Sequence, residues 1–237
     1  MARSELSSGI VATIVLGAGS GTRFGDQKQF LELTPGWRLI DAAVDTAKRC
    51  SSHVVVVLPP GLAWDGAEVD AVAGGGPTRL DSVEAGLSHV PPDARVVVVH
   101  DAAHPLADET VFGLVVDAVE TGADAAVPFL PVSDVIKQVD PSGIIVTVGR
   151  DGLGLAQVPM AFAPQVLRDA HARRHELGEA WEDSMLVERW KGRVVAVRGS
   201  TRNVHVVDEN DLEVARLLAK SLPSADAGSA NKLMPGL

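Results

Sequence analysis

The residues best suited to chemistry lie in a glycine-rich segment, 17–25, which follows an apolar run at 9–16. Glycines permit positive φ angles and close backbone approach, so successive N–H groups can converge on phosphate oxygens. Arg23 and Lys28 add mobile positive charge. The apolar run has the composition of a strand buried on both faces, and open α/β sheets bind ligands where such strands end. The segment therefore predicts a cradle for a nucleoside triphosphate.

The spacing of these glycines differs from that of the two common phosphate loops. A dinucleotide fingerprint opens a helix directly, whereas Arg23, Gly25 and Asp26 continue here as polar loop. A P-loop needs Gly-Lys followed by Ser or Thr, which this segment lacks. A tight turn without a ligand remains the alternative for this feature taken alone.

Two further clusters follow predicted strands. The loop 74–83 is rich in glycine, which can lie flat against a base or ribose, and Ser82 falls in the first turns of a predicted helix, where ligands meet hydroxyl and N–H groups. Asp101 follows the valine run 96–99, so its carboxylate is placed to hold Mg²⁺ against phosphates. The alternatives are a flexible connection for the loop and a helix-start cap for Asp101.

The composition indicates what kind of protein positions these residues. A length of 237 residues, 46% of them hydrophobic, suits one large α/β domain. The net charge of −10 disfavours nucleic-acid polymers and anionic membranes. No apolar run is long enough to span a bilayer and the polar start lacks a signal-peptide core, so we expect a cytoplasmic protein. Cys50 is the only cysteine, which excludes an internal disulfide.

Strand-like and helix-like segments alternate, which predicts an α/β fold with a Rossmann-like, mostly parallel twisted sheet flanked by helices. The expected strands are 9–16, 54–58, 96–99, 125–127, 194–198 and an edge-like 203–208. The expected helices are 39–48, 81–87, 110–120, 164–174, 184–190 and a last one that Asp208 caps and that reaches about 222.

The pattern changes beyond Pro128. Segments 134–139 and 144–148 flank the turn cluster 140–143, which predicts a protruding β-arm at about 131–150. Such arms commonly join two copies of a chain. We predict a single domain over 1–222, followed by a disordered tail at 223–237, where residues are small and polar.

Together these motifs resemble the 2-C-methyl-D-erythritol 4-phosphate cytidylyltransferase family, within the glycosyltransferase-A-like nucleotidyltransferases. The resemblance covers nearly the whole chain, and five ordered motifs are far more specific than one loop. The matching pieces are Gly17-Ala18-Gly19-Ser20-Gly21-Thr22-Arg23 with Lys28-Gln29-Phe30, Gly74-Gly75 with Arg79-Leu80-Asp81-Ser82-Val83, His100-Asp101-Ala102-Ala103, Arg150-Asp151-Gly152-Leu153, and Asn203 with Asp211-Leu212.

The resemblance implies an activity and a set of roles. In such enzymes an acceptor phosphate attacks the α-phosphorus of CTP and displaces pyrophosphate, as a step of non-mevalonate isoprenoid synthesis. It further implies that Arg23 and Lys28 are catalytic, that Asp101 holds Mg²⁺, and that the arm joins a homodimer. The implied nucleotide-binding residues are Gly17, Ala18, Gly19, Ser20, Gly21, Gly74, Gly75, Ser82 and Ala102. The implied acceptor-binding residues are His104, Arg150, Val158, Glu182 and His205, with Arg150 reached across the dimer.

The acceptor half departs from the family pattern. His104 stands where the family has Arg, Glu182 and Val158 replace threonines, and His205 replaces Lys. These changes remove donors and positive charge, so we expect weak binding of methylerythritol phosphate. Both histidines also fit an ordinary structural role. Two alternatives therefore stay open: a paralogue that uses another polyol or sugar phosphate, and a catalytically silent nucleotide-binding protein.

Overall fold

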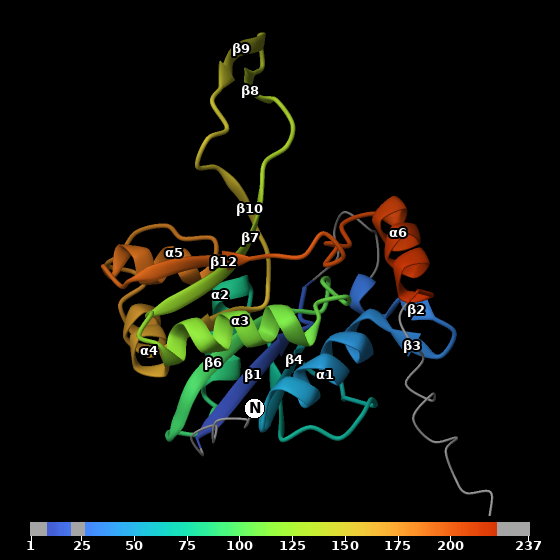
Figure 1. Ribbon diagram of the computed structural model, residues 1–237. Coiled ribbons are helices and arrows are strands. Elements are labelled where there is room, and N and C mark those ends of the chain that lie inside the picture. The colour runs from blue at the N-terminus through green and yellow to red at the C-terminus, as the bar shows by residue number, and fades with distance from the viewer. Residues whose placement is uncertain (1–8, 20–26, 222–237) are drawn as a thin grey trace, which may run out of the picture.

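A mixed, mostly parallel sheet forms the centre of the protein, as the sequence predicts. The computed structural model describes residues 9–19 and 27–221, so the predicted tail lies outside the described residues. Within them the strand order is β10-β7-β11-β6-β1-β4-β5, with β12 also paired to β7 (Figure 1). The strands are β1 (Ile10–Leu16), β4 (His53–Leu58), β5 (Ala71–Gly74), β6 (Ala94–Asp101), β7 (Ala125–Pro131), β10 (Gly154–Ala156), β11 (Met160–Phe162) and β12 (Val194–Arg198).

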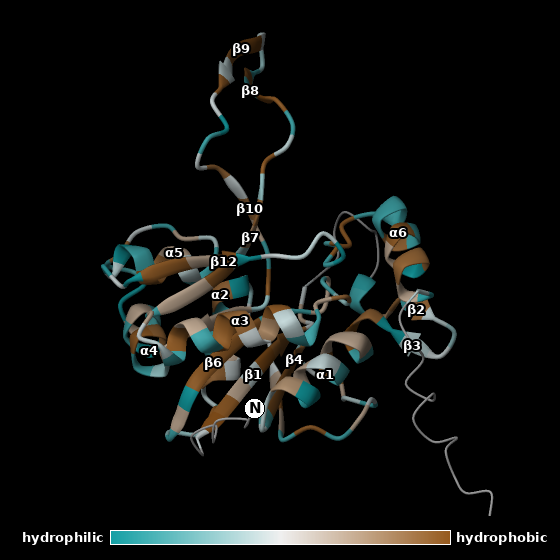
Figure 2. Cartoon of the chain, viewed as in Figure 1, coloured by the Kyte–Doolittle hydropathy of each residue, from teal (hydrophilic) through white to brown (hydrophobic). Residues whose placement is uncertain are grey.

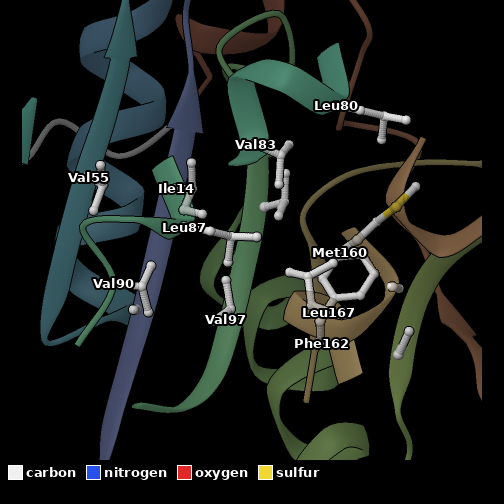
Figure 3. Packing of buried hydrophobic residues seen from close by; sticks show 14 of the residues in the cluster. Ile14, Val55, Leu80, Val83, Leu87, Val90, Val97, Met160, Phe162 and Leu167 are labelled. Carbon is white, nitrogen blue, oxygen red and sulfur yellow. The ribbon is translucent and has the colours of Figure 1, made fainter. Parts of the chain in front are cut away.

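The central strands are buried on both faces, which explains their continuous apolar sequences. In β1, Ile14 belongs to the cluster on one face of the sheet and Val15 to a cluster on the other. In β6, Val97 and Val98 alternate between faces in the same way. Figure 3 shows the first cluster, in which Ile14 and Val97 meet side chains from the covering helices. Figure 2 shows the hydrophobic colour along β1.

Helices cover both faces of the sheet. Side chains of α2 (Arg79–Leu87), α4 (Pro164–Ala172) and α5 (Asp183–Arg189) pack into the cluster on one face. On the other face, α1 (Leu39–Cys50) and α3 (Glu109–Glu120) bury their own apolar sides. The last helix, α6 (Glu209–Ala219), packs with the hairpin of β2 (Glu32–Thr34) and β3 (Trp37–Arg38), which follows a short 3-10 helix, η1 (Lys28–Phe30).

The predicted arm extends away from the sheet (Figure 1). It contains the hairpin of β8 (Ile136–Asp140) and β9 (Gly143–Val148), whose two strands pair only with each other among the described residues. Apolar side chains on it are exposed within one chain, including Ile144 at 71% and Val135 at 66%. The brown colour of β9 in Figure 2 marks the same property.

One element prediction is wrong. Residues 203–208 form no strand and run as bends and irregular backbone before α6. Their backbone groups are bound elsewhere: the N–H of Val206 donates to the Ala103 carbonyl at 2.8 Å, and the N–H of Val207 donates to the Asp211 carboxylate at 2.8 Å. Because these partners lie on a loop and a helix, no strand ladder forms.

Candidate active site

A cavity of about 520 Å³ opens at the carboxyl ends of β1 and β6, the place predicted from the glycine-rich segments. Ser20, Gly21 and Arg23 lie outside the described residues. The cavity brings together residues of both glycine loops, of η1 and of the loop after β6. Its lining is Leu16, Gly17, Ala18, Gly19, Lys28, Gln29, Gly76, Pro77, Thr78, Arg79, Ser82, Asp101, Ala102, Ala103 and His205.

The two glycine loops approach each other closely at Gly75 and Ala18. The N–H of Gly17 donates to the Val57 carbonyl and that of Gly75 to the Leu58 carbonyl, both at 2.7 Å. A Cβ at Gly75 would overlap the side chain of Ala18. Glycine is therefore required here for close approach of backbone. Gly74 and Gly75 shape the loop, while Gly76 lines the cavity.

The start of α2 is fixed by its own side chains. Thr78 and Asp81 form a capping box, in which each side chain accepts a hydrogen bond from the other's backbone N–H. Ser82 lines the cavity but its hydroxyl already donates to the Thr78 carbonyl at 3.1 Å and accepts from the Gly76 N–H at 3.2 Å. In this structure Ser82 thus holds the glycine loop in shape.

Asp101 is the last residue of β6 and caps no helix, since Asp108 caps α3. Its Oδ1 accepts a hydrogen bond from Nη2 of Arg79 at 3.2 Å. Burial alone would raise the pKa of this carboxyl, but the positive charge of Arg79 outweighs burial and holds the pKa below its ordinary value. Asp101 therefore presents a negative oxygen ligand to the cavity.

Lys28 and the loop before α6 are joined. The Nζ of Lys28, at the start of η1, donates to the Val206 carbonyl at 2.7 Å. The neighbouring Gln29 lines the cavity and is 4% exposed, and within the described residues its Nε2 has no hydrogen-bond acceptor. A buried amide without a partner is costly, so Gln29 is placed to donate to a ligand.

The predicted acceptor residues fall into two groups. His104 and His205 stack with ring centroids 4.4 Å apart, and His205 lines the cavity. Burial, followed by the charge of His205, lowers the pKa of His104 to about 3, so His104 is neutral at ordinary pH. Val158 is buried at 4% exposure and does not line the cavity; its carbonyl accepts a hydrogen bond from Nδ2 of Asn203 at 2.6 Å.

Arg150 and Glu182 do not join the cavity within one chain. Arg150 lies at the base of the arm and donates to the Ser133 carbonyl. Glu182 is the N-cap of α5, where its side chain accepts from the backbone N–H groups of Ser184 and Met185. The structure thus brings together the predicted nucleotide residues that it describes and leaves these two acceptor candidates apart from them.

Sequence reasoning missed two buried residues that reach the cavity through Arg79. Arg79 also donates to Asp183, and the other oxygen of Asp183 lies 2.8 Å from Nε2 of His171. The partners are distant in sequence, 104 residues for the first pair, so no local pattern reveals them. Only the motif that contains Arg79 indicated a special position.

A parallel-strand edge with two glycine loops, a lysine and an ionised carboxylate defines an α/β protein that binds a phosphorylated nucleotide. Residues 11–221 match the family model described as IspD, 2-C-methyl-D-erythritol 4-phosphate cytidylyltransferase. The chain therefore belongs to this family of nucleotidyltransferases, and the family and fold predicted from the sequence are confirmed.

Relatives and solved structures agree. The chain is 39% identical to the 2-C-methyl-D-erythritol 4-phosphate cytidylyltransferase of Saccharopolyspora erythraea, over 86% of this chain and 97% of that one. It is 35% identical to the bifunctional enzyme IspD/IspF of Solidesulfovibrio magneticus, where 91% of this chain covers 59% of the longer relative. The crystal structure of the cytidylyltransferase from Thermus thermophilus has a TM-score of 0.77 and 29% identity, with 87% of this chain and 98% of that one covered.

Proposed function

We propose that this chain transfers the cytidylyl group of CTP to 2-C-methyl-D-erythritol 4-phosphate, releasing pyrophosphate, as a step of isoprenoid biosynthesis. The observation that carries the proposal is the single cavity that Lys28, Asp101 and both glycine loops share in a member of this family. The second loop would give a wall for base and ribose beside the phosphate cradle.

The reaction assigns a task to each group. An oxygen of the acceptor phosphate forms a bond to the α-phosphorus of CTP as the bond from that phosphorus to the bridging oxygen breaks, and pyrophosphate leaves. Arg23 and Lys28 neutralise charge that develops on the leaving group. The backbone of Gly17, Ala18, Gly19, Ser20 and Gly21 cradles the phosphates, while Gly74, Gly75, Ser82 and Ala102 contact or shape the nucleoside site.

The cavity fits a magnesium ion that is bound partly by substrate. Mg²⁺ in nucleotide sites commonly takes one or two carboxylates together with phosphate oxygens. Within the described residues Asp101 supplies one ionised carboxylate, and no group of three or more potential ligands exists. Asp101 would thus hold the ion with the phosphates, where it would neutralise their charge. The residues that line the cavity would orient the nucleotide for attack by the acceptor.

The acceptor site is proposed to be completed by a second copy of the chain. The arm exposes a run of apolar side chains in one chain, and Arg150 lies at its base, outside its own cavity. A homodimer formed through the arm would cover the apolar residues and bring Arg150 to the partner's acceptor site beside His104 and His205. Val158 and Glu182 would then shape the wall of that site.

One feature of the helices bears on cellular location. Among residues 9–19 and 27–221, no helix combines the length and apolarity that crossing a membrane requires. We propose a cytoplasmic enzyme whose partners are a nucleotide and a small phosphorylated polyol, with no nucleic-acid polymer or membrane involved. Activity in the soluble fraction of lysed cells tests this location.

Pyrophosphate release tests the function. Purified full-length protein is assayed with each of four nucleoside triphosphates and a panel of polyol phosphates that includes methylerythritol phosphate. Release that requires CTP and methylerythritol phosphate supports the proposal, even with the high KM that the changed acceptor residues predict. Release with another acceptor supports the paralogue, and CTP binding without turnover supports a silent protein.

A further inference from the structure

A chain of polar contacts leads from the cavity wall into the interior between α2, α4 and α5. Arg79, the first residue of α2, donates from Nη2 to Asp101 and from Nη1 to Asp183. The second oxygen of Asp183 lies 2.8 Å from Nε2 of His171 on α4. The side chain of Asp183 is 0% exposed and that of His171 is 3% exposed, whereas Arg79 is 25% exposed and lines the cavity.

Stability alone does not explain why these charged side chains are buried. Removing charged groups from water costs free energy that their attraction often does not recover, and apolar side chains of similar volume serve a core as well or better. Although burial opposes its charge, Arg79 has its pKa raised above the ordinary value by Asp101 and Asp183 together. A buried charge cluster that ends on a cavity carboxylate therefore points to a role in the site.

The geometry shows what that role is. A guanidinium is planar and its donors form a rigid fork, so a contact on Nη1 fixes the direction of Nη2. Asp183, itself held by His171, thereby sets how Arg79 meets Oδ1 of Asp101. Within the described residues, Oδ2 of Asp101 takes part in no hydrogen bond.

We propose that Asp183 and His171 are positioning residues, which hold Arg79 so that Asp101 keeps one carboxylate oxygen available to the divalent cation of the bound nucleotide. The proposal rests on the proposed role of Asp101. Outer partners of metal-binding carboxylates typically account for about 10- to 100-fold in metal affinity or activity.

The chain offers a matched control in the same layer of helices. Arg174, just after α4, pairs with Asp81 at 2.7 Å and with Glu84 at 3.3 Å, both on α2. Like the contacts of Arg79, Asp183 and His171, these ion pairs connect the α4 region to α2. Unlike those contacts, they do not reach Asp101. Loss of Arg174 therefore reports what weaker helix packing does by itself.

The test compares Asp183→Asn with Arg174→Gln in the full-length protein. Mn²⁺ serves as a paramagnetic probe, titrated in the presence of a CTP analogue that cannot react. Asp183→Asn is expected to weaken Mn²⁺ binding by about 10- to 100-fold and to lower kcat similarly, with the KM for the acceptor unchanged. Arg174→Gln is expected to keep the Mn²⁺ affinity of the parent even where it lowers the melting temperature.

A second variant keeps the test decisive where Asp183→Asn does not fold. Arg79→Lys retains the positive charge but cannot span both carboxylates, so it is expected to lose Mn²⁺ affinity as Asp183→Asn does. Parent-like Mn²⁺ affinity in either folded variant overturns the proposal. A parent protein that binds Mn²⁺ with the CTP analogue but releases no pyrophosphate contradicts the proposed function, while the Mn²⁺ comparison still decides the positioning roles.

Discussion

Lys28 connects the cavity to the loop before α6. Its side chain lines the cavity, and its Nζ donates to the carbonyl of Val206, the residue after His205, at 2.7 Å. A mobile ammonium there can follow phosphate oxygens as pyrophosphate leaves. We therefore expect Lys28→Ala to lower kcat on the order of 10²- to 10³-fold without unfolding the protein. Steady-state rates and circular dichroism measure the two effects.

Lys48→Ala is the matched control for this prediction. Lys48 also donates from Nζ to a backbone carbonyl, that of Glu68 at 2.6 Å, but it lies on α1 outside the cavity lining. Its loss is expected to leave kcat as in the parent. Near-parent activity in folded Lys28→Ala would show that the lysine is a structural anchor for the loop before α6.

Asp101 is predicted to bind nucleotide through a cation. Asp101→Asn keeps the shape and an oxygen that Arg79 can contact, but removes the negative charge that a hard cation needs. We expect the variant to bind CTP with Mg²⁺ at least about tenfold more weakly, equivalent to about 1.4 kcal/mol, and to bind metal-free CTP no worse. Calorimetry with and without Mg²⁺ measures both affinities. Equal affinity for the magnesium complex in variant and parent would assign Asp101 to orienting Arg79 alone.

At this scale the sequence located the residues that come in local motifs. Ala18, Lys28 and Asp101 were identified because glycine spacing and strand ends are local signals, and all three line one cavity. Asp183 and His171 could not be identified, since their role depends on helices that pack together only in the folded chain.

The second glycine loop can be tested as an element. A Cβ at Gly75 would overlap Ala18, so Gly75→Ala must push the two loops apart. We expect at least about tenfold weaker CTP binding, since a displacement of about 1 Å misaligns preorganised N–H groups. Gly113→Ala, at a helical position with no atom within 4 Å of the new Cβ, is the control and is expected to raise stability by about 0.5–1 kcal/mol with parent-like binding.

The arm carries a prediction about association. Ile144 on β9 is 71% exposed in one chain, and burying it at a dimer contact would contribute about 1.5–3 kcal/mol. Ile144→Glu is thus expected to weaken dimerisation by at least about tenfold, measured by sedimentation. Leu217→Glu on α6, where the leucine is 65% exposed, is the control and should leave association unchanged. Parent and Ile144→Glu proteins that sediment alike would contradict an arm-mediated dimer.

Element prediction succeeded where burial and helical spacing are strong and failed where tertiary contacts decide. Strand β12 begins and ends at the residues predicted from the sequence, and the final helix begins after Asp208 as expected. The antiparallel strands β10 and β11 have three residues each, too few for a period to appear. Segment 203–208 has strand-like composition, yet its hydrogen bonds go to a loop and a helix.

Across the whole molecule, the net charge has the same sign as the charge of the proposed substrates. The net charge is −10, while the proposed substrates are anions. Attraction must therefore be local, and in the described cavity Arg79 is already shared between two carboxylates. Among the described residues, the groups that we propose attract phosphate are therefore Lys28, the loop backbone and the cation that Asp101 would hold.

Buried histidines couple the stability of the whole chain to pH. Burial lowers the pKa of His100, which is fully buried beside the Phe112 ring, from 6.5 to about 4, and that of His104 to about 3. In the unfolded chain both rings take up protons below about pH 6.5, whereas in the folded chain they stay neutral. The unfolded state thus binds more protons, so the free energy of unfolding falls as pH falls from 6.5 towards 4.

His100→Leu should remove one part of this dependence. Between pH 6.5 and 4, the variant takes up one fewer proton on unfolding than the parent does. The slope of its unfolding free energy against pH is therefore smaller by about 1.4 kcal/mol per pH unit, and the loss of stability that it avoids approaches about 3 kcal/mol at pH 4. Urea unfolding at pH 7.5, 6, 5 and 4 gives the slopes. His89→Gln, at an exposed ring, is the control and should keep the slope of the parent. The same slope in His100→Leu as in the parent would mean that His100 gains its proton before the chain unfolds.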